Sequence, residues 1–228
     1  MASTKDNLDI LFEDNHIIVV NKQPGDISQG DKTGDTPLSE IVKSYIKFKY
    51  NKPGKVYLGV VHRLDRPTSG VIIFAKTSKA LERLNKKLRD KEIQKTYWAV
   101  VKNRPPKSSD TLIHFLKKDH QKNKSKAYEK EIKDSKKAIL HYSILKQLDH
   151  YYLLEIQLET GRHHQIRTQL SHIGSPIKGD LKYGFPRSNK NASIHLHAHK
   201  IEFHHPVSKE RLTIEAKPPN DPVWNACE

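Results

Sequence analysis

The chain has 228 residues, a hydrophobic fraction of 35% and a formal net charge of +15. This length suffices for one catalytic domain or two small ones, and the patterned apolar segments exclude a wholly disordered chain. A charge this positive indicates a polyanionic partner, and nucleic acid fits best because the excess is spread along the chain. The single cysteine, Cys227, excludes an internal disulfide and a cysteine-based metal site. Without a signal region or a stretch of transmembrane length, we expect a soluble, cytoplasmic protein.

The first part of the chain predicts a strand pair followed by a helix. Apolar runs at 8–12 and 16–20 flank a tight turn and are typical of strands. A Gly- and Lys-rich loop follows at 29–35. Thr36 as N-cap and Pro37 as first helical residue then open a helix, which the turn residues 51–54 end.

A carboxylate stands in the turn between two further strand-like runs, at 57–61 and 71–75. Pro67 and Gly70 supply the turn chemistry, and Asp65 lies between Arg63 and Arg66. Nearby cations favour the ionised carboxylate that a nucleophile or base requires. Taken alone, however, this pattern is more typical of a salt-bridged loop aspartate that only fixes its turn.

The rest of the chain is rich in strands. After a helix that Thr77 or Ser78 can cap, we expect a loop at 104–110 and strands at 93–101, 138–148, 151–158, 195–203 and 211–216. Strands outnumber helices and follow one another as hairpins, so the predicted class is α+β, with a mixed, mostly antiparallel bent sheet flanked by helices and loops. The histidines between 195 and 205 are expected to be exposed strand residues.

Two basic segments are candidates for binding an anion. Residues 117–137 hold nine lysines against four acids and fit either an RNA-contacting arm or a solvated edge protected by lysines. A strand–glycine–helix junction carries the arginines Arg162 and Arg167 and the histidines His163 and His164, which predicts an anion or phosphate site. We expect no metal site, because the histidines lack acidic or cysteine partners at ligand spacing.

Three blocks in this order resemble the RluA family of pseudouridine synthases. They are His62-Arg63-Leu64-Asp65 with Thr68-Ser69-Gly70, then Lys95-x-Tyr97-x-Ala99, then Thr160-Gly161-Arg162-x-His164-Gln165-Ile166-Arg167. The similarity runs from about residue 8 to about residue 217. The early Lys22-x-Pro24-Gly25 is similar to a further block, with Gln23 shifting the usual Lys-Pro order, and Gln169 stands where relatives often have a histidine.

The resemblance implies a pseudouridine synthase-like fold and the isomerisation of uridine in structured RNA, either rRNA or tRNA or both, without metal or organic cofactor. The N1–C1′ bond breaks, the uracil turns, and C5 rejoins C1′. By this resemblance Asp65 is the catalytic carboxylate and Arg167 is the partner that keeps it charged. Tyr97 stacks on the uracil and takes part in proton transfer from C5, Ile166 packs on the base, and Lys95 supports the pocket.

The predicted RNA contacts combine the resemblance with the charge pattern. Arg63 would fill the gap that the extruded nucleotide leaves, and Arg66, Arg162, His164 and Lys22 would contact RNA. The loops at 22–32 and 117–137 would read the substrate. We expect a single catalytic domain over 1–228, with an ordered core at about 8–217, no separate N-terminal RNA-binding domain, no protein partner and a monomeric state.

Two other function classes compete with this interpretation. A non-catalytic RNA-binding or ribosome-assembly protein explains the charge equally well, but it has no need for an ionised aspartate that repels phosphate. A metal-dependent nuclease or phosphoryl-transfer enzyme would need a carboxylate cluster for Mg²⁺ or a Gly-rich phosphate loop, and this sequence has neither.

Overall fold

The computed structural model describes residues 3–30 and 34–227. Residues 31 and 32 of the predicted RNA-reading loop at 22–32 lie outside this description. The chain divides into two compact units, one formed by Met1–Lys95 with Ala198–Pro219 and the other by Thr96–His197 with Asn220–Glu228. The strands β5 (Gln94–Val101) and β10 (Leu196–His204) run from one unit into the other. The single catalytic domain therefore stays a prediction.

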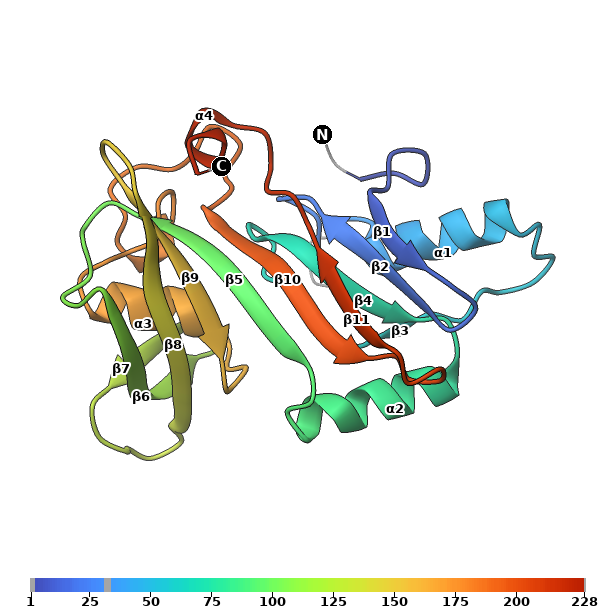
Figure 1. Ribbon diagram of the computed structural model, residues 1–228, viewed down its shortest axis with the longest axis horizontal. Helices are drawn as coiled ribbons and strands as arrows, with labels where there is room; N and C mark the ends of the chain where they lie inside the picture. The colour runs from blue at the N-terminus through green and yellow to red at the C-terminus, as the bar shows by residue number, and fades with distance from the viewer. Residues whose placement is uncertain (1–2, 31–33, 228) are drawn as a thin grey trace. The chain divides into compact units, whose positions relative to one another are not determined.

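The first unit is a mixed sheet with a helix against each face, in which the β1–β2, β2–β4, β3–β4 and β10–β11 pairs are antiparallel (Figure 1). Its strands run in the order β1-β2-β4-β10, with β3 on β4 and β11 on β10. Their bounds are β1 Ile10–Glu13, β2 Ile17–Lys22, β3 Gly59–Val60, β4 Ser69–Ala75 and β11 Arg211–Glu215, and the helices are α1 Leu38–Lys49 and α2 Ser78–Arg89.

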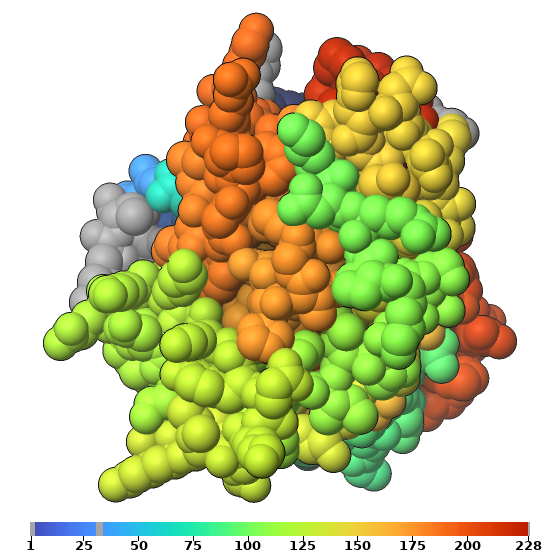
Figure 2. All heavy atoms as spheres, turned by 90° about the vertical axis from the view of Figure 1, so that its left-hand side faces the viewer, coloured from blue at the N-terminus to red at the C-terminus, as the bar shows by residue number. Residues whose placement is uncertain are grey.

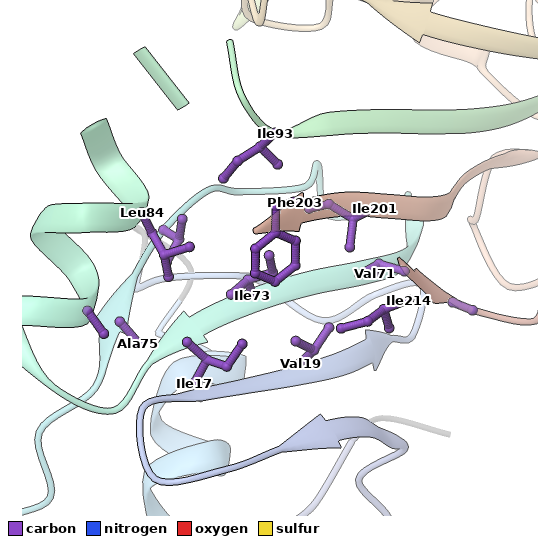
Figure 3. Close-up of a cluster of buried hydrophobic side chains, with 13 residues drawn as sticks. Ile17, Val19, Val71, Ile73, Ala75, Leu84, Ile93, Ile201, Phe203 and Ile214 are labelled. Atoms are coloured by element: carbon purple, nitrogen blue, oxygen red, sulfur yellow. The ribbon is translucent and has the colours of Figure 1, made fainter. Parts of the chain in front are cut away.

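Both faces of β2 and β4 are buried, which explains why these strands are almost uninterrupted apolar runs. On one face, Ile17 and Val19 of β2 belong to a cluster with Leu84 of α2, shown in Figure 3. On the other face, Ile18 of β2 packs in a second cluster with Val42 of α1. The two helices therefore cover both faces of β4, the strand that follows the Asp65 turn.

The helix α1 begins differently from the prediction. Pro37 is the N-cap, and no side chain caps the helix. Instead, the first helical N–H, that of Leu38, donates to the carbonyl of Ile27 at 2.8 Å. A backbone oxygen eleven positions earlier thus replaces the expected Thr36 cap, a partner that local sequence does not reveal.

Gly70, the second residue of β4, stands where a side chain does not fit. Its φ is +114°, and an added Cβ would lie 2.6 Å from the backbone nitrogen of Ala198 in β10. We expect Gly70→Ala to lower the free energy of unfolding by about 3 kcal/mol or more, since strain and a backbone clash add up. Gly54→Ala, at a position with open space around it, should change it by less than about 1 kcal/mol. Urea denaturation of both variants measures the difference, and equal midpoints would contradict the prediction.

The second unit is an antiparallel sheet in the order β5-β9-β8-β6-β7, with a short helix near its basic edge. The strands are β6 Ser109–Asp119, β7 Lys124–Tyr128, β8 Lys136–Gln147 and β9 Tyr152–Leu158, and the helices are α3 Gln165–His172, η1 Leu181–Tyr183 and α4 Pro222–Asn225. The predicted hairpin at 138–158 is confirmed as β8–β9.

The basic stretch 117–137 contains the end of β6, all of β7 and the start of β8, joined by turns. Its register runs from Phe115 opposite Tyr128 to Asp119 opposite Lys124 in the β6–β7 pair. The long strand β6 begins at Ser109, where a loop was predicted from the polar cluster. Continuous pairing of Ser109–Leu116 with Lys136–Ser143 of β8 overrides the weak local preference of those residues.

The prediction that the histidines between 195 and 205, in and beside β10, are exposed is wrong for His195, His197 and His205, which are 3%, 0% and 3% exposed. His195 stacks on Trp224 with ring centroids 5.2 Å apart and lies 3.2 Å from the Asp221 carboxylate. Burial therefore lowers the pKa of His195 to about 4. The C-terminal segment covers this part of the strand. The alternation of polar and apolar residues along a strand does not reveal that a distant segment will bury its polar face. Among the described residues, no helix is both long and apolar enough to cross a membrane.

Candidate active site

Asp65 occupies a tight turn immediately before β4 in the first unit. The Thr68 N–H donates to the Asp65 carbonyl at 3.0 Å, which closes the turn. The Asp65 side chain is half-buried, whereas the neighbouring Arg63 and Arg66 are exposed. Arg66 also pairs with the exposed Asp35 at 2.7 Å. The turn thus holds one carboxylate at the protein surface between two solvent-facing cations.

Lys22, at the end of β2, lies beneath this turn and is fully buried. Its ammonium donates to the carbonyls of Gln23, Arg66 and Thr68 at 3.0, 3.1 and 2.6 Å. All three donors are used inside the protein, so this structure does not place Lys22 for the RNA contact that we predicted. Its geometry is that of a residue that positions the loop around Asp65.

Burial lowers the pKa of Lys22 to about 8. The negative charges of Asp26 and Asp65 oppose this shift, and Arg66 adds to it. The ammonium below the turn and the carboxylate in the turn are therefore electrostatically coupled within one unit.

A second buried residue fastens the same loop from the other side. The Ser28 hydroxyl donates to the Leu64 carbonyl at 2.9 Å and accepts from the Leu64 N–H at 3.1 Å. In addition, the Gly25 N–H donates to the Arg66 carbonyl at 2.9 Å. The segment that follows β2 thus holds the backbone on both sides of Asp65, which fixes a catalytic group on a rigid support.

His62 and Lys95 also belong to this unit, and the charge of Lys95 acts on His62. His62 accepts a hydrogen bond at Nε2 from the Ile73 N–H of β4 at 3.2 Å, so the neutral ring carries its proton on Nδ1. Burial, with the charge of Lys95, lowers the pKa of His62 to about 3. Burial also lowers the pKa of Lys95. His62 is therefore neutral at physiological pH and serves as an acceptor for the strand.

The low pKa of His62 predicts that the folded protein loses stability in acid. Between pH 6.5 and pH 3 the unfolded chain binds a proton at His62 and the folded protein does not, so stability falls as the pH is lowered, by at most about 1.4 kcal/mol per pH unit. We expect His62→Gln, which keeps an acceptor, to show a shallower loss of stability over this range. Urea unfolding at several pH values measures both slopes, and parallel curves would contradict the assignment.

In the second unit, Arg167 is held by a buried carboxylate. The Arg167 Nε and Nη2 donate to Asp180 Oδ2 and Oδ1 at 2.7 and 2.9 Å. The Asp180 side chain is 1% and the Arg167 side chain 6% exposed. Such a bidentate pair fixes the plane of the guanidinium. Tyr97 and Ile166, the other two predicted site residues of this unit, are buried as well.

Asp65 and Arg167 belong to different units, so their pairing remains a prediction. The structure does bring together Lys22, Asp65 and Arg66 in the first unit, along with His62 and Lys95.

The side chain of Gln165, the first residue of α3, ties the start of this helix to the segment before it and to β8. Its Oε1 accepts from the Thr160 hydroxyl at 2.8 Å and from the Arg162 N–H at 2.9 Å, and its Nε2 donates to the Ile139 carbonyl at 3.0 Å. His164 takes the left-handed conformation at the N-cap, with φ +52°. The exposed Arg162 donates from Nε to the Lys137 carbonyl at 2.9 Å. Its position at the surface is compatible with the predicted RNA contact.

Four residues that hold the Asp65 turn in the first unit, or Arg167 and the start of α3 in the second, were not predicted as site residues. They are Ser28, Gln165, Asp180 and Tyr183. A signal for the last two was present, since Gly179-Asp180 and Tyr183-Gly184 follow the helix with turn-type spacing. For Ser28 no sequence pattern indicates its partner, which is 36 positions away.

One group of residues has the composition of a metal site. His114, Glu129 and His172 each place a ligand atom within 4.8 Å of the others. However, the Gln169 amide, which also donates to the Leu112 carbonyl, lies 3.0 Å from His114 Nδ1. That nitrogen is then an acceptor, and the proton of neutral His114 sits on Nε2, the atom facing Glu129. Because a metal would need Nε2 without its proton, the arrangement favours a hydrogen-bonded cluster.

Comparison with solved structures gives the class of fold. The structure matches "Human RNA Pseudouridylate Synthase Domain Containing 4" with a TM-score of 0.79 over 95% of this chain and 90% of that one, at 23% sequence identity. The predicted α+β pseudouridine synthase fold is thereby confirmed. The sequence model of RNA pseudouridylate synthases matches residues 16–172. The chain belongs to the RNA pseudouridylate synthase family, and its activity is the isomerisation of uridine in RNA to pseudouridine.

Curated relatives agree with this membership. The chain is 34% identical to the "Uncharacterized RNA pseudouridine synthase YlyB" of Bacillus subtilis, over 94% of this chain and 70% of the relative. It is 37% identical to a "Ribosomal large subunit pseudouridine synthase C" of Buchnera aphidicola, over 91% and 66%. It is 32% identical to the "tRNA pseudouridine synthase C" of Yersinia pestis, over 92% and 86%. The predicted resemblance to the RluA family is confirmed.

Proposed function

We propose that Asp65 is the catalytic carboxylate of this isomerase. The observation that carries the proposal is the support of its turn, in which buried Lys22 and Ser28 bind the backbone on both sides of one partly exposed aspartate. A turn that only needed a salt bridge would not require two buried polar residues, each of which costs free energy to desolvate. An aspartate held in this way can act as a nucleophile or base with little reorganisation.

The resemblance supplies the roles of the other residues. Arg167 orients Asp65 and keeps it charged. Tyr97 stacks on the extruded uracil, Ile166 packs on the same base, and Lys95 supports the pocket. The target base must leave its stack, at a cost of about a few kcal/mol, before any of these contacts can form. Arg63 replaces the extruded nucleotide.

The substrate class that we propose is structured RNA, either ribosomal or transfer RNA. Relatives at similar identity are named for each of these classes. The exposed cations Arg66 and Arg162, the half-buried His164 and the lysines of 117–137 would contact phosphates, which makes binding salt-dependent. The protein would act as a monomeric catalytic domain in the cytoplasm and needs neither a cofactor nor a protein partner.

Tritium release from RNA labelled at uracil C5 tests this proposal, because C5 becomes the glycosidic carbon and must lose its hydrogen. Unmodified ribosomal RNA and transfer RNA are offered separately, in the presence of EDTA. We expect release from at least one of them. Tight, salt-sensitive binding without release from either RNA would favour the non-catalytic binding protein instead.

A further inference from the structure

The strand β7 presents lysines on one face and fits the protein interior with the other. Ser125 and Ala127 are buried, whereas on the other face Lys124 is half-buried and Lys126 is exposed. Figure 2 shows that the yellow-green side chains of this basic region occupy much of one face, beside the orange segment that holds α3 and η1. The outward row has the charge that RNA phosphates bind.

The inward face of β7 is tied to a single tyrosine. The Ser125 N–H donates to the Tyr183 hydroxyl at 2.8 Å, and this hydroxyl lies 2.9 Å from His164 Nδ1 at the start of α3. The Ser125 hydroxyl in turn donates to the His163 carbonyl at 2.9 Å. Tyr183 is 4% exposed, so these bonds are shielded from water.

The ring of the same tyrosine contacts two cations. The Arg167 guanidinium carbon lies 5.0 Å and the Lys124 ammonium 5.1 Å from the ring centroid. The Tyr183 N–H donates to the carbonyl of Asp180, the residue that holds Arg167 through its side chain. One side chain thus contacts the basic strand by its hydroxyl and Arg167 by its ring.

We propose that Tyr183 is a positioning residue that couples RNA binding on the Lys124 face of β7 to the orientation of Arg167. The inference rests on the proposed function, in which Arg167 orients the catalytic aspartate. A phosphate bound at Lys124 draws its ammonium away from the tyrosine ring, and the hydroxyl bonds transmit the resulting shift of β7 to the start of α3. The partner that this surface fits is the backbone of the RNA substrate. The effect is a faster chemical step when an RNA phosphate is bound at Lys124 than when this position is empty.

Two conservative variants separate this role from simple folding. Tyr183→Phe keeps the ring and removes the hydroxyl that joins β7 to α3. Tyr142→Phe makes the same chemical change at another buried tyrosine of this unit, whose hydroxyl donates to the Lys107 carbonyl at 3.2 Å, and is the matched control. Lys124→Gln, alone and combined with Tyr183→Phe, tests the coupling by a double-mutant cycle. Each variant is compared in single-turnover tritium release at saturating RNA, in RNA affinity, and in melting temperature.

We expect Tyr183→Phe to slow the single-turnover rate about tenfold while RNA affinity changes less than about twofold, and Tyr142→Phe to keep the wild-type rate and affinity. Lys124→Gln should weaken binding and slow the rate about threefold in the wild-type background, but leave the rate unchanged in the Tyr183→Phe background.

Three results would overturn the proposal. Equal rates for Tyr183→Phe and Tyr142→Phe, or additive effects of Tyr183→Phe and Lys124→Gln, would show that no coupling exists. A rate loss that disappears on assay well below the melting temperature would assign Tyr183 a purely structural role. If the wild type itself released no tritium, the proposed function would fail as well, whereas an active wild type with an unaffected Tyr183→Phe would remove only the coupling.

Discussion

Asp65→Asn is expected to abolish pseudouridine formation, with a rate loss of roughly 10³-fold or more, while the protein folds and binds RNA as before. The amide has the shape of the carboxylate but cannot act as a nucleophile or base. Because the turn is held through backbone atoms by Lys22 and Ser28, the variant should keep the geometry of the loop. Single-turnover tritium release gives the rate, and a filter-binding titration gives the affinity.

Asp90→Asn is the matched control for this prediction. It makes the same change at an exposed aspartate that ends α2 in the same unit. We expect its rate and affinity to equal those of the wild type. Turnover by Asp65→Asn at a rate comparable to that of Asp90→Asn would remove Asp65 from the mechanism.

Asp180→Asn should be the most destabilising polar substitution among those considered. It leaves the buried Arg167 guanidinium without its carboxylate, and removing one partner of a buried ion pair costs about 3–5 kcal/mol. The same change frees Arg167 from its fixed orientation, so activity should fall even where the protein is folded. Urea denaturation and tritium release at low temperature measure the two effects separately.

A double variant distinguishes stability from function at this pair. Arg167→Met combined with Asp180→Leu removes both charges and fills a similar volume, so much of the lost stability should return. Activity should stay low, because the oriented guanidinium is absent. If Asp180→Asn cost less than about 1 kcal/mol, or if the double variant were active, the buried pair would not have the role assigned to it.

Local sequence patterns predicted most of the strands and the two segments that carry Asp65 and Arg167. The hairpin around Asp65 follows from two apolar runs separated by Pro67 and Gly70, and β3 and β4 do pair antiparallel there. The hairpin β8–β9 and the helix α3 were predicted in the same way. These elements depend on neighbours in sequence, which is why periodicity and turn residues were sufficient.

Predictions failed where a residue's environment comes from a distant part of the chain. The ammonium of Lys22 reads as a surface charge in sequence, yet its acceptors include the Thr68 carbonyl, 46 positions away. Buried His195 owes its environment to Trp224 in the C-terminal helix α4. The strand β6 forms over polar residues because β8 offers a complete ladder of partners.

The sequence by itself determined the class of this protein, through three short blocks in fixed order, and the position of the candidate nucleophile in a strand–turn–strand unit. Only the tertiary structure decided what holds that chemistry in place: Lys22 and Ser28 under the Asp65 turn, and Asp180 with Tyr183 around Arg167. The physical reason is that buried polar groups must find hydrogen-bond partners wherever the fold brings them. Those partners are set by packing between remote segments, which no local pattern encodes.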